Sequence, residues 1–245
     1  MIRKNKTIVI TGASSGIGEA TAEKFVHEGY NVVLAARRKD KIQAILDRLS
    51  QYNGNVKIKV TDVTSQKEVQ ELIDFTIKEF QQVDILFNNT GLMPLSFMKN
   101  RKVDEWEKMI DVNIKGVLYG VNAVLPYMME RNEGHIITTS SVAGHEVAPA
   151  ETVYAATKFA ARVIMEGLGK ELAGTNIRTT SISPGFTATD LASTITDQEA
   201  IDMLTSGPEV TPLQSKDVAE AVFYAVNQPS RVNVNEVIVR PNDLP

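Results

Sequence analysis

Cysteine is absent from this sequence of 245 residues, and long hydrophobic runs are absent too. The lack of cysteine excludes disulfide bonds, thiolate catalysis and cysteine-ligated zinc, and it is typical of proteins in a reducing compartment. No stretch approaches the roughly eighteen apolar residues that a membrane span needs, and the N-terminus lacks the apolar core of a signal peptide. We therefore expect a cytoplasmic protein that does not enter the membrane.

Histidine and concentrated positive charge are also scarce. The three histidines, His27, His135 and His145, fall in a predicted helix, strand and loop without the spacing of paired metal ligands, so we expect no metal site. The net charge is −4, and the densest basic groups, at residues 3–6 and 37–39, are short. Nucleic-acid binders usually carry a basic patch or stripe, so we expect no nucleic-acid partner.

Short apolar runs alternate with longer helical patterns along the chain. Strands are predicted at 7–10, 31–35, 56–60, 85–88, 135–139, 178–181 and 236–239. Helices are predicted at 66–80, 104–130, 153–173 and 215–227, and the second of these is expected to be bent, with Pro126 as a breaker inside it. Near-continuous apolar strands that alternate with helices predict an α/β fold, in which a doubly wound parallel sheet carries helices on both faces.

A single domain covering residues 1–245 is expected, because the chain contains no internal repeat and no linker rich in proline, glycine or serine. The least patterned stretch, residues 186–212, is predicted to form a mobile lid over a substrate.

A glycine-rich turn, Thr11–Gly18, joins the first predicted strand to the first helix. Glycines at this position allow the backbone to approach a pyrophosphate closely, and the helix N-terminus then presents N–H groups to it. The pattern therefore indicates a dinucleotide site, with a purely structural turn as the alternative. The second strand ends in Ala36, Arg37 and Arg38, without the carboxylate that would bond a ribose 2′-hydroxyl. Because guanidinium groups suit a phosphate, we expect NADP(H), bound mainly by Arg37 with help from Arg38 and Ser14. The alternative is that both arginines only solvate the strand end.

Three further residues have the chemistry that hydride transfer requires. Tyr154 and Lys158 are four residues apart in a predicted helix and share one face. A neighbouring ammonium is expected to lower the pKa of the phenol toward the working range. Ser141 follows the strand at 135–139, at the carboxyl edge of the sheet where ligands bind in this architecture. We expect Ser141 to bond the substrate oxygen, Tyr154 to exchange its proton, and Lys158 to hold the nicotinamide ribose.

With these motifs in this order, the chain resembles the short-chain dehydrogenase/reductase family over essentially its whole length. The matching segments are Thr11–Gly18, Asp62-Val63-Thr64, Asn88-Asn89-Thr90-Gly91, Asn113, Ser141, Tyr154 with Lys158, and Pro184-Gly185. The resemblance implies a seven-stranded Rossmann-like sheet and a Ser-Tyr-Lys centre. It also implies that Asn113 completes a proton relay through water to Lys158.

The resemblance further implies which residues hold the cofactor. It assigns Asp62 to the adenine, the 88–91 run to the adenosine ribose, and the segment after Pro184-Gly185 to the nicotinamide amide and pyrophosphate. The full set of candidates is Gly12, Ser14, Ser15, Gly16, Ile17, Gly18, Arg37, Arg38, Asp62, Val63, Asn89, Thr90, Gly91, Tyr154, Lys158, Pro184, Gly185, Thr187 and Thr189. Two positions depart from the family pattern: Thr90 replaces an alanine, and Ser15 stands where phosphate-preferring members often have a basic residue.

We conclude from the sequence that the protein is an oxidoreductase that moves a hydride between NADP(H) and a small carbonyl or secondary-alcohol compound. A non-catalytic NADP-binding regulator is one alternative, although such a protein would not need all four of Asn113, Ser141, Tyr154 and Lys158. An epimerase or dehydratase is the other, although only about 60 residues follow Pro184. The resemblance also implies a homo-oligomer, either a dimer or a tetramer, paired through the helices at 104–130 and 153–173.

Overall fold

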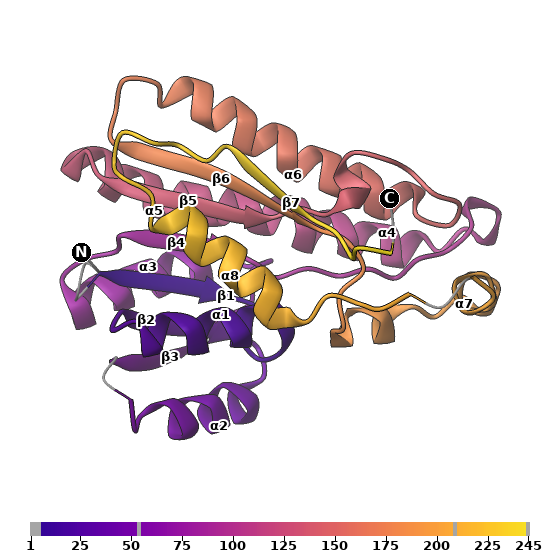
Figure 1. Ribbon diagram of the computed structural model, residues 1–245, viewed down its shortest axis with the longest axis horizontal. Helices are drawn as coiled ribbons and strands as arrows, with labels where there is room; N and C mark the ends of the chain where they lie inside the picture. The colour runs from indigo at the N-terminus through magenta and orange to yellow at the C-terminus, as the bar shows by residue number, and fades with distance from the viewer. Residues whose placement is uncertain (1–5, 53–54, 208–209, 244–245) are drawn as a thin grey trace.

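Seven parallel strands form one sheet in the order β3-β2-β1-β4-β5-β6-β7 in the computed structural model, which describes residues 6–52, 55–207 and 210–243 (Figure 1). The strands are β1 (Thr7–Thr11), β2 (Asn31–Ala36), β3 (Val56–Val60), β4 (Ile85–Asn88), β5 (Gly134–Thr139), β6 (Ile177–Pro184) and β7 (Glu236–Val239). All seven strands predicted from the sequence are confirmed. The strand order reverses between β1 and β4, which in a doubly wound sheet marks the place where ligands bind.

Helices cover both faces of this sheet, because successive strand residues point to opposite sides. In β1, Ile8 and Ile10 belong to a buried cluster with α1, α2 and α8, whereas Val9 belongs to a second cluster with α3, α5 and α6. The helices are α1 (Gly16–His27), α2 (Lys39–Leu49), α3 (Gln66–Phe80), α4 (Val103–Ile110), α5 (Gly116–Arg131), α6 (Thr152–Glu171), α7 (Gln198–Thr205) and α8 (Ser215–Val226). The predicted Rossmann-like, doubly wound single domain is therefore confirmed.

The long helix predicted at 104–130 is interrupted, but at a different place from the one expected. A π-helical turn, Asp111–Lys115, separates α4 from α5, and Pro126 lies inside α5 without ending it. The expectation that Pro126 breaks the helix was therefore wrong. Asn113 explains the position of the break, because its side chain exchanges two hydrogen bonds with the main chain of Leu92, each 2.9 Å long. A π-turn accommodates the extra residue that this attachment requires, and such turns often occur at functional sites.

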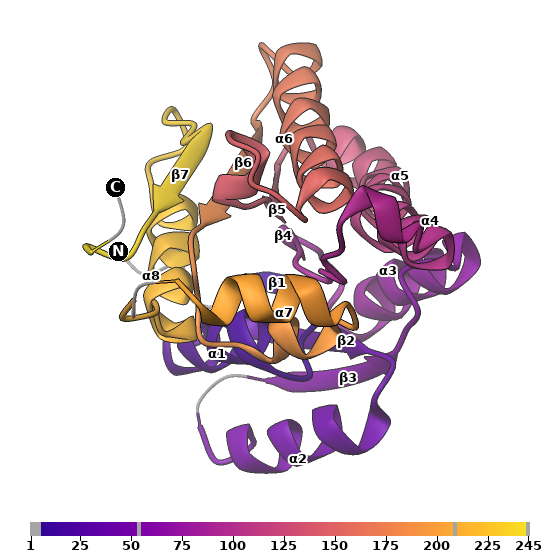
Figure 2. The same ribbon diagram turned by 90° about the vertical axis from the view of Figure 1, so that its right-hand side faces the viewer.

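The segment at 186–212 contains more regular structure than the sequence predicted. It forms a short 3₁₀ helix, Asp190–Thr194, and the eight-residue helix α7. Pro208 and Glu209 of this segment lie outside the described residues. Eight residues are too few to show a sustained apolar period, which explains why α7 was missed. Figure 2 shows α7 lying across the end of the molecule at which the strands terminate.

The described residues show neither a membrane span nor a cluster of metal ligands. None of the helices in this part of the chain combines the length and the apolar character needed to cross a membrane. The same residues include no group of three or more His, Asp or Glu side chains placed to hold a metal ion.

Candidate active site

The predicted site residues come together at the carboxyl ends of the central strands, at the end of the molecule seen in Figure 2. The glycine-rich turn follows β1, the 88–91 run follows β4, Ser141 follows β5, and Pro184 ends β6. In parallel strands these ends lie at the same edge of the sheet, so segments far apart in sequence become neighbours.

The glycine-rich turn leaves no room for side chains at two of its positions. Gly12 has a φ of 65°, and a Cβ there would lie 2.9 Å from the Cα of Thr90. A Cβ at Gly18 would lie 2.4 Å from the carbonyl oxygen of Gly12. These contacts explain why the turn is glycine-rich, and they leave its N–H groups at the start of α1 accessible to an anion. Ile17 instead packs against the core cluster of α1 and α8.

The run after β4 is fastened to the strands on both sides of it. The backbone N–H of Asn89 donates to the Thr11 hydroxyl at 3.0 Å, and its side-chain amide donates to the Thr11 carbonyl at 3.2 Å. The Thr139 hydroxyl donates to Asn89 Oδ1 at 3.0 Å. The run therefore links β1 to β5 through hydrogen bonds. The backbone of Thr90 lies directly beside Gly12.

Ser141, Tyr154 and Lys158 form one cluster. Tyr154 and Lys158 are buried on α6, and the Lys158 Nζ lies 5.7 Å from the centre of the Tyr154 ring. This Nζ donates to the Thr139 carbonyl at 3.0 Å. The Ser141 side chain lies near enough to Tyr154 to lower the pKa of its phenol, and the Ser141 hydroxyl accepts the N–H of Ala143 at 3.1 Å and donates to the Pro184 carbonyl at 3.4 Å.

Asn113 approaches this cluster from the π-helical turn. Its amide nitrogen donates to the Thr157 hydroxyl at 3.0 Å, and Thr157 in turn donates to the Tyr154 carbonyl at 2.7 Å. A Cβ at Gly91 would lie 3.6 Å from both Asn113 Oδ1 and Lys158 Nζ, so these two side chains lie close to the same glycine. All four predicted catalytic residues therefore meet in one place.

The pKa values of this cluster differ from the sequence expectation. Burial raises the pKa of Tyr154 to about 12, a hydrogen bond with Ser141 lowers it, and the charge of Glu151 raises it further. Burial also lowers the pKa of Lys158 to about 8. The expectation that Lys158 lowers the pKa of Tyr154 is therefore wrong for the chain by itself, because burial penalises both the phenolate and the ammonium.

A cavity of about 410 Å³ lies beside the glycine-rich turn. Its charged lining residues are Arg38, Lys41 and Arg48 together with Glu19 and Asp190, and Arg48 pairs with Glu19 at 2.7 Å. The Arg38 guanidinium donates to the Ser14 hydroxyl at 2.8 Å and to the Ser15 hydroxyl at 2.9 Å.

Arg37 and Arg38 are both exposed, but Arg37 makes no hydrogen bond or ion pair within the described part of the chain. Lys41 was not predicted as a site residue. It lies three residues after Arg38 in the first turn of α2, and this spacing could have indicated that both side chains are on the same face of the helix.

The other predicted cofactor residues surround the same edge of the sheet. Asp62 accepts the N–H and the hydroxyl of Thr64, at 2.9 and 2.8 Å, and Val63 packs against the position of Gly116. Thr189 lies against Gly16, within 3.2 Å of a Cβ there. The remaining candidates, Pro184, Gly185 and Thr187, form the end of β6 and the turn after it, in which the Thr187 hydroxyl donates to the Gly185 carbonyl.

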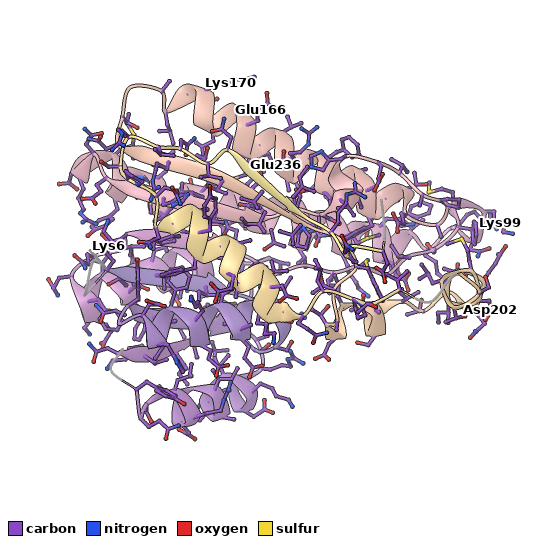
Figure 3. All side chains as sticks on the ribbon, in the orientation of Figure 1. Lys6, Lys99, Glu166, Lys170, Asp202 and Glu236 are labelled. Atoms are coloured by element: carbon purple, nitrogen blue, oxygen red, sulfur yellow. The ribbon has the colours of Figure 1, made fainter. Side chains whose placement is uncertain are left out.

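The loop after Ser141 is attached to β7. His145 Nε2 lies 2.8 Å from Glu236 Oε1, and Glu146 pairs with Arg240 at 3.0 Å. Glu236 is labelled on β7 in Figure 3. The other two histidines lie elsewhere, since His135 is buried in β5 against Thr180 and His27 packs against Tyr52.

Comparisons with known proteins agree with this arrangement. The family described as short chain dehydrogenase matches residues 6–200, and the chain belongs to this family. An uncharacterised oxidoreductase of Staphylococcus saprophyticus is 48% identical over 244 residues, which are 98% of this chain and 97% of that protein.

Two solved structures are similar along nearly the whole chain. A serine dehydrogenase in its closed form, complexed with NADP⁺, has a TM-score of 0.86 and 33% identity, and the match covers 95% of this chain and 93% of that one. A short chain dehydrogenase/reductase from Burkholderia phymatum, in complex with NAD, has a TM-score of 0.87 and 30% identity, with 97% and 90% covered. The protein is accordingly an oxidoreductase of the short-chain dehydrogenase/reductase family.

Proposed function

We propose that the protein transfers a hydride between NADP(H) and a small or medium-sized carbonyl or secondary-alcohol compound. The observation that supports this most directly is that Tyr154 and Lys158 share one buried helix face, with Ser141 near the phenol and Asn113 beside Lys158 at Gly91. The glycine-rich turn fits the cofactor, because a side chain at Gly12 or Gly18 would collide with the surrounding backbone.

In this mechanism the nicotinamide, when bound, supplies or accepts the hydride. Ser141 donates a hydrogen bond to the substrate oxygen and so polarises the carbonyl. Tyr154 gives its proton to that oxygen during reduction and takes it back during oxidation. Tyr154 is protonated at neutral pH, so it carries the proton that reduction requires. Lys158 and Asn113, which both lie beside Gly91, return the proton to Tyr154 from the solvent.

NADP(H) is the proposed cofactor, because the residues that would meet the adenosine ribose are basic. Arg38 is already held at the glycine-rich turn by Ser14 and Ser15, and Lys41 lines the same cavity. Forked guanidinium donors match a 2′-phosphate, and the two residues directly after β2 are arginines rather than a carboxylate that would repel it. The serine dehydrogenase complexed with NADP⁺ supports this choice, although the Burkholderia relative carries NAD.

Residues 186–212 are proposed to be a lid over this site. The lid is fastened across the site by the Thr194 hydroxyl, which accepts the Met93 N–H at 3.2 Å, and by Asn100, which donates to Asp197 at 2.7 Å. An ion pair between Lys99 and Glu199 at 2.7 Å adds to this attachment. Release of these contacts would open the site. We propose that the protein works in the cytoplasm, because the chain has no cysteine.

Tyr154→Phe tests the proposed chemistry. The change removes one oxygen from a buried ring, so the fold and NADPH binding should persist while turnover falls at least about a hundredfold. Turnover is measured by NADPH absorbance across a panel of ketones and secondary alcohols, with NADPH binding measured by calorimetry. Turnover equal to that of the wild type in Tyr154→Phe would contradict the proposal.

A further inference from the structure

His145 lies at the end of the short turn that begins with Ser141. The turn is a 3₁₀ helix, Val142–Gly144, with Ser141 directly before it and His145 directly after it. The N–H of Gly144 donates to the Ser141 carbonyl at 2.9 Å, and the N–H of His145 donates to the Val142 carbonyl at 2.9 Å. Because successive hydrogen bonds of this type make the turn one unit, a displacement of His145 is transmitted to Ser141.

The neighbouring strands β6 and β7 provide the partners of His145. Ile182 on β6 belongs to the cluster with α1 and α8, so the next residue, Ser183, faces the other side of the sheet. Glu236 on β7 pairs in register with Ser181, two residues before Ser183, and therefore shares that side. Ser183 is buried, and its hydroxyl donates to Glu236 Oε1 at 2.7 Å.

The imidazole of His145 contacts both of these side chains. Its Nε2 lies 2.8 Å from the same oxygen of Glu236 and 3.3 Å from the Ser183 hydroxyl (Figure 3 labels Glu236). A carboxylate can only accept, so Nε2 carries a hydrogen and donates it to Glu236. Hydrogen bonds to an ionised group are roughly twice as strong as neutral ones. His145 is thus attached to β6 and β7 together.

These contacts complete a ring that includes the Ser141 hydroxyl. Ser141 Oγ accepts the N–H of Ala143 at 3.1 Å and donates to the Pro184 carbonyl at 3.4 Å, and Pro184 directly follows Ser183. The ring runs from Ser141 along the turn to His145, across to Ser183, and back through Pro184. The bond from Ala143 occupies a lone pair of the hydroxyl, which leaves its hydrogen directed at Pro184 or at a substrate oxygen that replaces it.

The other charged groups beside the turn hold it in different directions. Arg162 on α6 donates from Nε to the Gly144 carbonyl at 3.1 Å, so it fastens the side of the turn that faces α6. Glu146 pairs with Arg240 at 3.0 Å, but the side chain of Glu146 is 60% exposed. Exposed ion pairs contribute little to stability. The attachment of the turn to the strands therefore depends on His145, whose side chain is 23% exposed.

We propose that His145, together with Glu236, is a positioning residue that holds the Ser141 hydroxyl in its reactive orientation. The role rests on the proposed function, in which Ser141 bonds the substrate oxygen. His145 acts by keeping the turn against the end of β6, so that the hydroxyl needs no rearrangement when the substrate arrives. Small displacements of a reacting group are costly, since about 1 Å can reduce the rate a hundredfold.

Three variants of neighbouring side chains test this role. His145→Leu removes the bond to Glu236, and kcat should fall at least about tenfold while NADPH affinity and Tm change little. His145→Gln keeps an N–H donor near the position of Nε2 and should restore most of kcat. Glu146→Gln is the matched control on the same loop, and its kcat should stay within about twofold of the wild type because its ion pair is exposed. A His145→Gln enzyme as slow as His145→Leu, or an equal loss in Glu146→Gln, would overturn the proposal.

A double-mutant cycle with Ser141→Ala separates positioning from a general loss of structure. If His145 acts through the Ser141 hydroxyl, His145→Leu should cause no further loss of kcat in an enzyme that already lacks this hydroxyl. Losses that multiply in the double variant would show that His145 acts elsewhere.

Hydrogen exchange of the enzyme without substrate keeps this test distinct from that of the proposed function. Peptides that span residues 141–146 report on the amides of Ala143 and Gly144. In His145→Leu their protection should fall about tenfold, as for the loss of one hydrogen bond, and in Glu146→Gln it should be unchanged. Unchanged protection in His145→Leu would overturn the role of His145 alone. Full turnover in Ser141→Ala would instead contradict the proposed function, and the exchange data would still show whether His145 holds the turn.

Discussion

At the residue scale, Lys158 is an ammonium group held where the protein disfavours charge. Burial lowers its pKa from 10.5 to about 8, so folding destabilises the protonated form. Below about pH 8 the lysine is protonated in both the folded and unfolded states, and the full cost is present. Between pH 8 and 10.5 the unfolded chain binds more protons, so the cost declines as pH rises and disappears above 10.5.

Lys158→Met should therefore stabilise the fold while abolishing function. At pH 7 we expect a gain of about 1–2 kcal/mol, because the loss of a buried charge outweighs the loss of its bond to Thr139, and a rise of a few degrees in Tm. The gain should shrink between pH 8 and 10.5. Thermal unfolding at pH 7 and at high pH measures both effects. A variant less stable than the wild type at pH 7 would mean that the Thr139 bond dominates.

The two arginines after β2 should contribute differently to cofactor choice. Arg38 is anchored by Ser14 and Ser15, so Arg38→Ala should weaken NADPH binding about tenfold or more and NADH binding much less. Arg37→Asp should reverse the preference, since a carboxylate repels the 2′-phosphate and accepts from the 2′-hydroxyl. Calorimetry with both cofactors provides the comparison, and equal losses for NADPH and NADH would contradict a phosphate site here.

At the scale of elements, the short helix α7 depends on a single buried side chain at its start. Asp197 caps α7 by accepting the N–H of Ala200 at 3.2 Å, and it also accepts Asn100 at 2.7 Å. The hydrogen bond from Asn100 is the main reason that the pKa of Asp197 is lowered. One side chain therefore both starts the helix and ties the lid to the segment after β4.

Asp197→Ala should loosen the lid without unfolding the sheet. The loss of a helix cap costs about 1 kcal/mol, and the bond to Asn100 is lost with it. We expect faster limited proteolysis within 186–212 and a higher KM for the substrate, with little change in Tm. Asp202→Ala is the control, because Asp202 lies on α7 at the same end of the molecule but is exposed and bonds only within its own helix (Figure 3). Equal proteolysis of the two variants would argue against the lid.

At the scale of the whole molecule, apolar side chains are exposed on the helices of one side. Ile110 on α4, Leu118 on α5 and Val163 on α6 are 41%, 43% and 58% exposed. Exposed apolar residues on neighbouring helices are typical of a surface that pairs with its copy. We predict a homo-oligomer, dimer or tetramer, with a mass by light scattering that is two or four times that of the chain.

Leu118→Glu together with Val163→Glu should shift this oligomer toward monomers, because a carboxylate on each helix would be buried without a partner on assembly. A wild-type chain that is monomeric at micromolar concentration would refute the prediction. An assembly unaffected by both changes would place the interface elsewhere.

The sequence by itself determined the order of the seven strands, the longer helices and most residues of the site, but not α7 or Lys41. Strands and the longer helices were predictable because their apolar periods are local properties. Ser141 was predictable because it follows a strand end that a parallel sheet brings to the binding edge, and Tyr154 and Lys158 because they share one helix face. Asn113 was expected only from the family resemblance, and it lies beside Lys158 at Gly91.

Only the tertiary structure decided where the helix at 104–130 is interrupted, which arginine is anchored at the glycine-rich turn, and how burial shifts the pKa values of Tyr154 and Lys158. Each of these depends on contacts between distant segments, such as that of Asn113 with Leu92, or on the removal of a group from water. Local sequence patterns carry neither kind of information, because desolvation and long-range hydrogen bonds arise only when the elements pack.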